Sequence, residues 1–386
     1  MKGFKVIKKL ITSIAFVLVS IVLISWGGVG HSIISQKVSL SFNSEMNDFN
    51  AWTSYLSAHA SDADNRKNTS DPNYDPNESI RHYIDIDNYA DFINTGKIEQ
   101  NYDAAVTKYG QSAVNSNGTL PWATEVAFDS LKNSMKRYDW VKAKQFAADL
   151  GHYVADGHMP LHITDNYNGQ NTGNTGIHSR YESTMIGSYS SLITYAGTSA
   201  INISNVNQYI FDYIYKNNTY VDSVLAADSY AVNLAGGVRN STTYNSTVYK
   251  QALWDKTRTL TIKLFKNGSH AFAELIYTAW VQAGKPSLTS TDIEKPIIEF
   301  TESLEQNSPN PFTTHTNIKY NLSENADITL QIKDVLGNTI TTLFKGFNKA
   351  GNYSIDWYPQ NQQEGLYFIV LDTKRIHSVR KMLLTK

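Results

Sequence analysis

The sequence predicts a mainly α-helical domain followed by a small all-β sandwich. Three observations indicate this division: apolar residues recur at helical spacing up to about residue 285, Ser, Thr and two prolines gather over 284–308, and strand-like runs separated by Gly and Asn turns follow. At 386 residues, with 41% hydrophobic and 18% charged side chains, the chain is globular and long enough for two cores.

Helices are expected where apolar residues follow a 3.6-residue period. Three segments fit: Trp140–Asp156, Trp122–Tyr138 and Ala271–Gln282. Pro121 stands at the favoured first position before the second of these, and Gly284 and Pro286 end the third. Two stretches rich in Asn, Ser, Gly and Asp, 62–77 and 166–176, are expected to be loops.

Strands are expected in the last part of the chain, where β-branched and aromatic residues alternate with polar ones. Four runs fit this description: Thr316–Leu322, Ala326–Val335, Tyr353–Trp357 and Gly365–Asp372. Together they describe a sandwich of about 75–80 residues, which is a reasonable size for an independent domain.

The first residues predict a signal peptide over 1–25. Four lysines and no acidic residue precede an apolar run, Leu10–Ile24. An uncleaved membrane anchor is the alternative, but the run is short for a span. Cleavage after Ser25 makes Trp26 the first mature residue, leaves no stable transmembrane anchor, and changes the formal charge from −1 to −5 because four lysines are removed. This charge argues against tight, purely electrostatic binding of nucleic acid.

The chain has ten histidines, and they cluster with carboxylates. His152 and Asp156 are four residues apart on an expected helix, so both side chains leave the same face. Pro160 breaks that helix and His162 follows, while His178 and Glu182 repeat the four-residue spacing. One such histidine alone is more often a packed residue, but the combination predicts a metal site. Since the chain has no cysteine and calcium and magnesium prefer oxygen ligands, zinc is the expected metal.

At these residues the sequence resembles the zinc-dependent phospholipase C and single-strand-specific nuclease superfamily. His-x3-Asp-x5-His followed by His-x3-Glu is similar to the signature of that superfamily, and the resemblance covers roughly 26–285. Trp26-Gly-Gly-Val-Gly-His31 agrees with it, because the family binds zinc through the free amine and carbonyl oxygen of a mature N-terminal tryptophan. The resemblance implies the family's helical fold and three zinc ions per chain.

The resemblance also implies a role for each ligand. A first zinc is assigned to Asp64, His82, His152 and Asp156; a second to His162, His178 and Glu182; and a third to Trp26 and His31, with Asp156 bridging back to the first. Asp62 competes with Asp64 for its position. Asp64 and Asp156 are the expected catalytic residues, Asp64 by orienting the nucleophile. Tyr83 is expected to contact the substrate, with ordinary packing as the alternative.

The implied function is a secreted trinuclear-zinc hydrolase of phosphodiester bonds. Gly-Ile-His-Ser-Arg-Tyr-Glu at 176–182 favours a phospholipase C-like enzyme, whereas Trp-Gly-x-x-Gly-His and His-x-Pro-Leu-His are more similar to the nuclease branch. The expected substrate is therefore a phospholipid, and the alternative is single-stranded nucleic acid or a nucleotide. A surface binding protein with structural zinc is an alternative of another class.

The C-terminal part, 307–386, resembles the C-terminal sorting domain of the type IX secretion system, and a linker over 286–306 precedes it. The resemblance rests on Asn-Ser-Pro-Asn-Pro-Phe at 307–312, Asp-Val-Leu-Gly-Asn at 334–338 and the Arg-Lys-Met-Leu-Leu near the end. It implies the type IX machinery as a partner and a secreted or cell-surface location. A carbohydrate- or surface-binding sandwich is the alternative, and the mature protein is expected to be a monomer.

Overall fold

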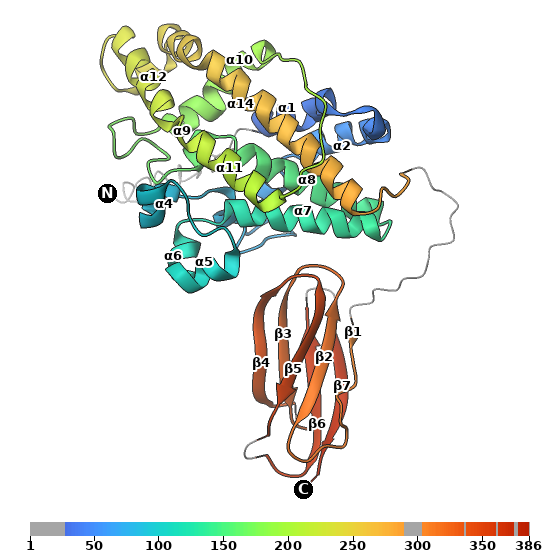
Figure 1. Cartoon of the computed structure of the whole chain (residues 1–386). Coiled ribbons are helices and arrows are strands. Elements are labelled where there is room, and N and C mark those ends of the chain that lie inside the picture. The colour runs from blue at the N-terminus through green and yellow to red at the C-terminus, as the bar shows by residue number, and fades with distance from the viewer. Residues whose placement is uncertain (1–27, 289–302, 336, 360–361, 374–376, 386) are drawn as a thin grey trace, which may run out of the picture.

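The structure is a computed structural model that describes residues 28–288, 303–335, 337–359, 362–373 and 377–385 (Figure 1). The predicted signal peptide, Trp26 and most of the predicted linker lie outside the described residues. Helices occupy the first part of the chain and a two-sheet β-sandwich the last part, so the expected fold class is confirmed. No helix of the described residues combines the length and the hydrophobicity that crossing a membrane requires.

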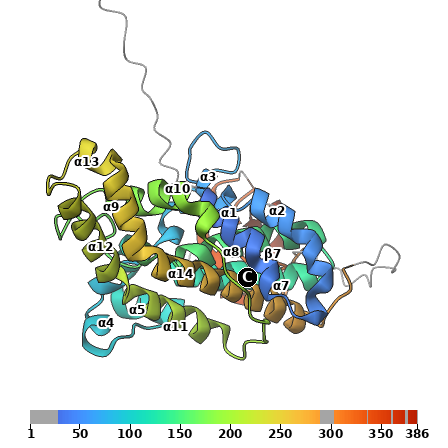
Figure 2. The ribbon, with the colours of Figure 1, turned by 90° about the horizontal axis from the view of Figure 1, so that it is seen from above.

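Five long helices form the framework of the helical region. They are α7 (Leu120–Lys136), α8 (Trp140–Asp156), α11 (Val206–Asn218), α12 (Val221–Leu234) and α14 (Thr247–Gln282). Seen from above in Figure 2, α14 crosses the region, and it contacts α1, α7, α8 and α12.

Shorter helices surround this framework. The short α-helices are α1 (Val29–Gln36), α2 (Thr53–Ala58), α3 (Asp62–Asn65), α4 (Ala90–Thr95), α5 (Tyr102–Tyr109), α6 (Gln111–Ser116), α9 (Ile177–Ser179), α10 (Ile186–Tyr189) and α13 (Ser241–Asn245). The 3₁₀ turns are η1 (Lys37–Ser41), η2 (Ser44–Trp52), η3 (Ser79–His82), η4 (Ile86–Asn88), η5 (Pro160–His162) and η7 (Ser190–Leu192), and η6 (Arg180–Met185) is a π-helix.

Helix α8 is the element that positions the site. Its first turn is capped by the Asp139 side chain, which accepts a hydrogen bond from the Lys142 amide at 3.0 Å. Gly151 lets the helix approach α14 closely, because a Cβ at this position would lie 2.6 Å from the ring of Phe272. Its last turn stands between two hydrophobic clusters, since Val154 belongs to one and Ala155 to the other.

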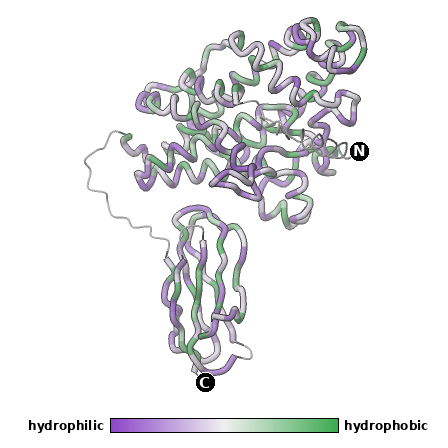
Figure 3. The backbone as a smooth tube through the Cα atoms, turned by 180° about the vertical axis from the view of Figure 1, so that it is seen from behind, coloured by the Kyte–Doolittle hydropathy of each residue, from purple (hydrophilic) through white to green (hydrophobic). Residues whose placement is uncertain are grey.

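The strands form two antiparallel sheets. They are β1 (Ser303–Leu304), β2 (Thr316–Leu322), β3 (Ala326–Lys333), β4 (Thr339–Asn348), β5 (Gly351–Trp357), β6 (Gly365–Asp372) and β7 (His377–Leu384). The sheet orders are β1-β2-β5 and β4-β3-β6-β7. Hydrophobic and hydrophilic residues alternate along these strands (Figure 3), and the hydrophobic set forms a separate core that includes Ile318, Leu330 and Ile369.

Several expected boundaries differ from the structure. The closing helix α14 ends at Gln282 as expected but begins at Thr247, well before Ala271. The expected loop 62–77 opens with α3. Strand β3 ends at Lys333 rather than at Val335, and β1, β4 and β7 were not expected. Strand β4 is rich in Thr and mostly half-buried or exposed, so it lacks the buried alternation that marks the other strands.

Candidate metal centre

Four predicted ligand side chains converge beside the last two turns of α8. The His82 Nδ1 atom lies 2.9 Å from His152 Nε2 and 3.5 Å from Asp64 Oδ1. Asp156 Oδ2 lies 3.0 Å from His82 Nδ1 and 3.2 Å from His152 Nε2. Atoms that bind one tetrahedral zinc ion at about 2.0–2.1 Å lie roughly 3.3 Å apart. These four atoms, which we call the first group, therefore have the spacing of a shared coordination shell.

A second group brings together His162, His178 and Glu182. Glu182 Oε2 lies 2.5 Å from His178 Nε2 and 3.6 Å from His162 Nε2. Both His162 and Glu182 are buried, whereas the His178 side chain is 25% exposed. Glu182 lies on the π-helix η6, a rare backbone form that is frequent at functional sites. Three protein ligands leave room for a water or a substrate atom on a metal ion.

A third group joins His31 of α1 to α8. The His31 ring stacks on the His152 ring, with 3.9 Å between the centroids and 5° between the planes. His31 Nε2 lies 3.5 Å from Asp156 Oδ1, so the two oxygens of Asp156 face different groups. Trp26, the other expected ligand here, lies outside the described residues.

Backbone carbonyl groups fix the orientation of two ligand imidazoles. His152 Nδ1 donates a hydrogen bond to the Ala60 carbonyl at 2.7 Å, and His162 Nδ1 donates one to the His82 carbonyl at 2.7 Å. A carbonyl oxygen can only accept, so Nδ1 carries the proton in both neutral rings. Each Nε2 atom is then left with a lone pair that points into its group, which is the usual arrangement around a metal-binding histidine.

Burial and mutual charge shift the pKa values of these ligands strongly. Burial opposes a charge on His152 and His162, but Asp156 together with Asp64 or Glu182 outweighs it and raises the pKa of both imidazoles to about 9. Burial would raise the pKa of Glu182, but His178 and His162 lower it to about 2. Burial, followed by the neighbouring His152, lowers the pKa of His31 to about 3.

The residues fit a zinc centre. Within the described part of the chain, Asp156 Oδ1, His162 Nε2 and Glu182 Oε1 are buried without a hydrogen bond. Buried polar atoms of this kind are costly unless something satisfies them. A cation in each group would satisfy them, and imidazole with carboxylate is a donor set that suits zinc. Candidate metal sites are therefore present where the sequence predicted them.

Asp64 rather than Asp62 faces the first group. Asp62 Oδ2 lies 2.8 Å from His59 Nδ1, and its side chain is 47% exposed. The remaining histidines of the described helical region have other surroundings: His158 is buried and donates from Nδ1 to the Val154 carbonyl, and His270 pairs with Glu274. These two histidines and His59 belong to none of the three groups.

Tyr83, the expected substrate residue, follows His82 directly and is half-buried. The Tyr83 hydroxyl donates a hydrogen bond to the Ser116 carbonyl at 3.3 Å. Position 118 must be glycine for Tyr83 to lie this close, because a Cβ at Gly118 would be 2.2 Å from the Tyr83 carbonyl oxygen. Contact with a substrate stays a prediction. A more exposed tyrosine, Tyr167, lies beside the second group, with 5.9 Å between its ring centroid and that of His178.

Two supporting residues were missed by the sequence reasoning. Lys67 Nζ lies 2.5 Å from Asp64 Oδ1, which places an ammonium group at the edge of the first group. Glu78 is fully buried, and its Oε1 lies 3.4 Å from His82 Nε2. The four-residue spacing between Glu78 and His82 in the sequence could have predicted the contact between these two side chains.

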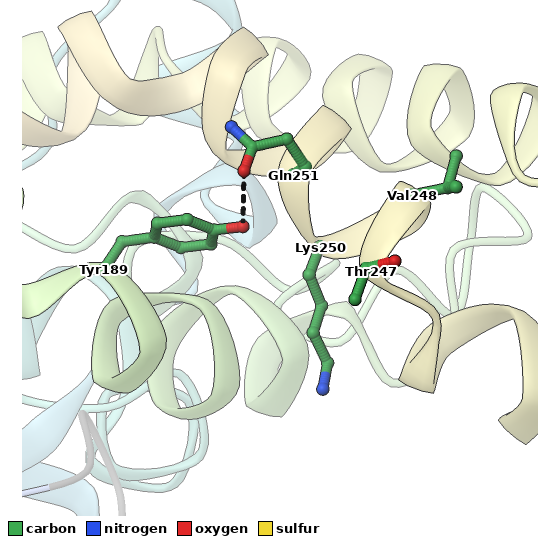
Figure 4. A pocket seen from close by; sticks show the side chains of 5 residues that line it. All are labelled: Tyr189, Thr247, Val248, Lys250 and Gln251. Carbon is green, nitrogen blue, oxygen red and sulfur yellow. Dashed lines mark hydrogen bonds between the residues drawn. The ribbon is translucent and has the colours of Figure 1, made fainter.

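A surface pocket of about 460 Å³ lies elsewhere, between α10 and the start of α14 (Figure 4). Its lining residues are Tyr189, Thr247, Val248, Lys250 and Gln251, and the Tyr189 hydroxyl donates to Gln251 Oε1 at 3.1 Å. This lining contains no histidine or carboxylate, so it offers none of the chemistry of the three groups.

Comparison with known families identifies the C-terminal part. Residues 308–385 match the family described as the secretion system C-terminal sorting domain. The chain ends in a sorting domain. This sorting domain coincides with the β-sandwich, in agreement with the expected type IX tail. A search of curated proteins finds no match.

Solved structures similar to the whole chain include two clostridial toxins. The alpha toxin of Clostridium absonum has a TM-score of 0.42 and 10% identity, covering 94% of this chain and 96% of the toxin. The alpha-toxin of Clostridium perfringens, from avian strain SWCP, has the same TM-score and identity, covering 93% of this chain and 97% of the toxin. At this level the likeness assigns no activity, and the functional argument rests on the three groups.

Proposed function

We propose that the chain is an exported zinc-dependent hydrolase of phosphodiester bonds, leaning towards a phospholipase C-like activity. The observation that carries the proposal is the position of Asp156, whose two oxygens face the first group and His31. A carboxylate shared in this way brings several divalent ions close together around one reacting phosphate. Closely spaced metal ions are typical of enzymes that cleave phosphate esters.

Two residues of the chain would act beside the metal ions. When bound, zinc ions lower the pKa of a water molecule and neutralise charge on the phosphate. Asp64, on the more open side of the first group, would accept a hydrogen bond from the attacking water and so orient it. Lys67, held against Asp64, adds a positive charge where an anionic phosphate would approach.

The surroundings of the second group favour a phospholipid with a cationic headgroup. Asp87 lies beside the segment that follows His162, because its Oδ1 accepts a hydrogen bond from the Asp165 amide at 2.8 Å and its Oδ2 accepts one from the Thr164 hydroxyl. Burial, and then the neighbouring Asp165 and Asp87, raise the pKa of Asp85 to about 7. The Ile84 amide donates to the His162 carbonyl at 2.8 Å, which places Asp85 next to this ligand segment. Carboxylates repel a polyanion, whereas carboxylates and a tyrosine face together suit a quaternary ammonium group.

A single-strand-specific nuclease or nucleotidase is the second candidate. The half-exposed ring of Tyr167 beside His178 supports it, because a base could stack on an aromatic face at this position. The structural-zinc alternative is less well supported, since structural sites are closed by four protein ligands and the second group supplies three.

The location follows from the sorting domain. We infer that a signal peptide directs the chain across the inner membrane and that the type IX machinery recognises the β-sandwich. The enzyme would then act as a monomer, secreted or at the cell surface, where phospholipids and nucleic acids of other cells are accessible.

A substrate comparison with metal removal tests the proposal. The purified mature chain is assayed on phosphatidylcholine vesicles and on single-stranded DNA, before and after dialysis against a chelator. We expect hydrolysis of the phospholipid, its loss on chelation and its recovery with zinc. Cleavage of DNA alone would select the nuclease, and full activity after verified removal of zinc would overturn the metal mechanism. His152→Ala should retain the fold but lose zinc and turnover.

A further inference from the structure

Glu78 is a buried carboxylate at the start of η3, and the sequence reasoning gave it no role. Its Oε2 accepts hydrogen bonds from Arg66 Nε at 3.0 Å and from Arg81 Nη1 at 3.1 Å. Its Oε1 accepts a hydrogen bond from the hydroxyl of Tyr153, the residue that follows the ligand His152. These contacts hold both oxygens in fixed directions, and Oε1 faces His82 Nε2 at 3.4 Å.

His82 needs a particular tautomer to serve the first group. Its Nδ1 atom is the one near Asp64, His152 and Asp156, so this nitrogen must carry the lone pair. The proton of the neutral ring then lies on Nε2, which is buried and makes no hydrogen bond of normal geometry within the described structure. A buried N–H group requires an acceptor, and Glu78 Oε1 is in place to become that acceptor.

We propose that Glu78 is a positioning residue that holds His82 in its Nε2–H tautomer and thereby sets the zinc affinity of the first group. The inference rests on the proposed metal function. The other two ligand imidazoles of known orientation, His152 and His162, are fixed by backbone carbonyls. His82 differs because a charged side chain would fix it, so a single substitution can reverse its tautomer.

The arginines explain why a carboxylate is required. In Glu78→Gln, the donors of Arg66 and Arg81 would hold the amide oxygen on their side. The amide nitrogen would then face His82 and donate to Nε2. That hydrogen bond places the ring proton on Nδ1, where it blocks zinc binding. The substitution therefore keeps the size of the side chain at position 78 but changes which nitrogen of the His82 ring carries the proton.

The test compares Glu78→Gln with Asp149→Asn. Asp149 Oδ1 accepts from Arg66 Nη1 at 3.0 Å, so this control removes a charge from the same network, and among the described residues Asp149 forms no hydrogen bond or ion pair with His82. Zinc affinity is measured by competition with chelators of graded strength, and bound zinc is counted by elemental analysis. We expect Glu78→Gln to weaken one zinc site about 10–100-fold, as outer-shell changes do. We expect the second group to be unaffected and Asp149→Asn to stay within about twofold of the natural chain, since it leaves this outer shell intact.

A measurement on the natural chain keeps the test decisive if Glu78→Gln does not fold. Nitrogen-15 NMR of the zinc-loaded protein should show His82 protonated at Nε2 and ligating through Nδ1; the reverse would overturn the inference. Equal losses in both variants, or unchanged first-site affinity in folded Glu78→Gln, would also overturn it. Absence of zinc from the natural chain would instead defeat the proposed function, so the two failures are distinguishable.

Discussion

Asp156 is the side chain that links the first group to the third. One oxygen faces His82 and His152, the other faces His31, and the residue is fully buried. Burial would raise the pKa of Asp156, but the neighbouring His152 and His162 outweigh it and hold the pKa well below the usual range, so the side chain is an anion at every pH of interest. No other described ligand faces two groups in this way through separate oxygens.

Asp156→Asn should therefore remove more than one ion. We expect loss of zinc from the first and third positions and retention at the second, with kcat/KM reduced by at least about 100-fold, as loss of ligand charge implies. Elemental analysis and the phospholipid assay measure both effects. Asp62→Asn is the control, because Asp62 is half-exposed and pairs with His59. Unchanged zinc content in Asp156→Asn would contradict the bridging role.

Zinc binding should release protons. In the metal-free chain the pKa values of His152 and His162 are about 9, so both rings are protonated at pH 7. Zinc must displace these protons, and its affinity should fall as the pH drops below about 9, by up to about tenfold per pH unit at each site. Calorimetry in buffers of different ionisation enthalpy should show about one proton released from each ring. A binding heat independent of the buffer would rule this out.

Trp26 permits a test at the mature terminus. A free α-amine can bind zinc, whereas a peptide nitrogen has no available lone pair. A chain that begins at Ser25 should hold two zinc ions, and one that begins at Trp26 should hold three. Mass spectrometry identifies the natural start, and elemental analysis counts the metal. Three ions in the extended chain would exclude the tryptophan amine as a ligand.

The ligand residues could be predicted because their spacing along a helix is short-range information. His152 and Asp156 share a face of α8, and His178 and Glu182 lie one turn apart. The choice between Asp62 and Asp64 could not be made, because both lie on the short α3 and only the fold decides which one faces His82. The contact between Lys67 and Asp64 could not be predicted either, because it depends on how the chain runs through and after α3.

At the scale of elements, the contact between α8 and α14 should limit stability. Gly151→Ala places a methyl group 2.6 Å from the buried ring of Phe272, and overpacking of this kind costs about 1–3 kcal/mol. Gly187→Ala in α10 is the control, since nothing lies within 4 Å of its added Cβ; it should be neutral or stabilise by up to about 1 kcal/mol. Urea unfolding of both variants measures the difference. Equal stabilities would show that α14 can move away from α8 without cost.

Elements with a buried face were predicted well, and elements without one were not. Helix α8 and strands β2 and β6 match their expected bounds, because burial imposes a clear period on their residues. The first part of α14 was missed because polar side chains interrupt its apolar pattern, as in Lys250 and Asp255. Strand β4 pairs along one edge with β3 and leaves its side chains partly exposed.

At the scale of the whole molecule, metal removal should affect the two parts differently. All three groups lie in the helical region, and the described residues of the β-sandwich contribute to none of them. Free zinc at 100 times its dissociation constant stabilises a site by about 2.7 kcal/mol. Since 1 kcal/mol changes Tm by about 2–4 °C in a region of this size, a chelator should lower the helical transition by roughly 5–10 °C per site. Calorimetry should show the sandwich transition unchanged, and an equal shift of both would contradict separate cores.

The carbonyl groups that orient His152 and His162 come from Ala60 and His82, which are 92 and 80 residues away along the chain. Such partners meet only after the helical region has closed on itself. A polypeptide held open during transport would therefore have scattered imidazoles and no competent centre. If the proposed hydrolase acts on phospholipids, the producing cell would be shielded from it until folding is completed beyond the cytoplasm.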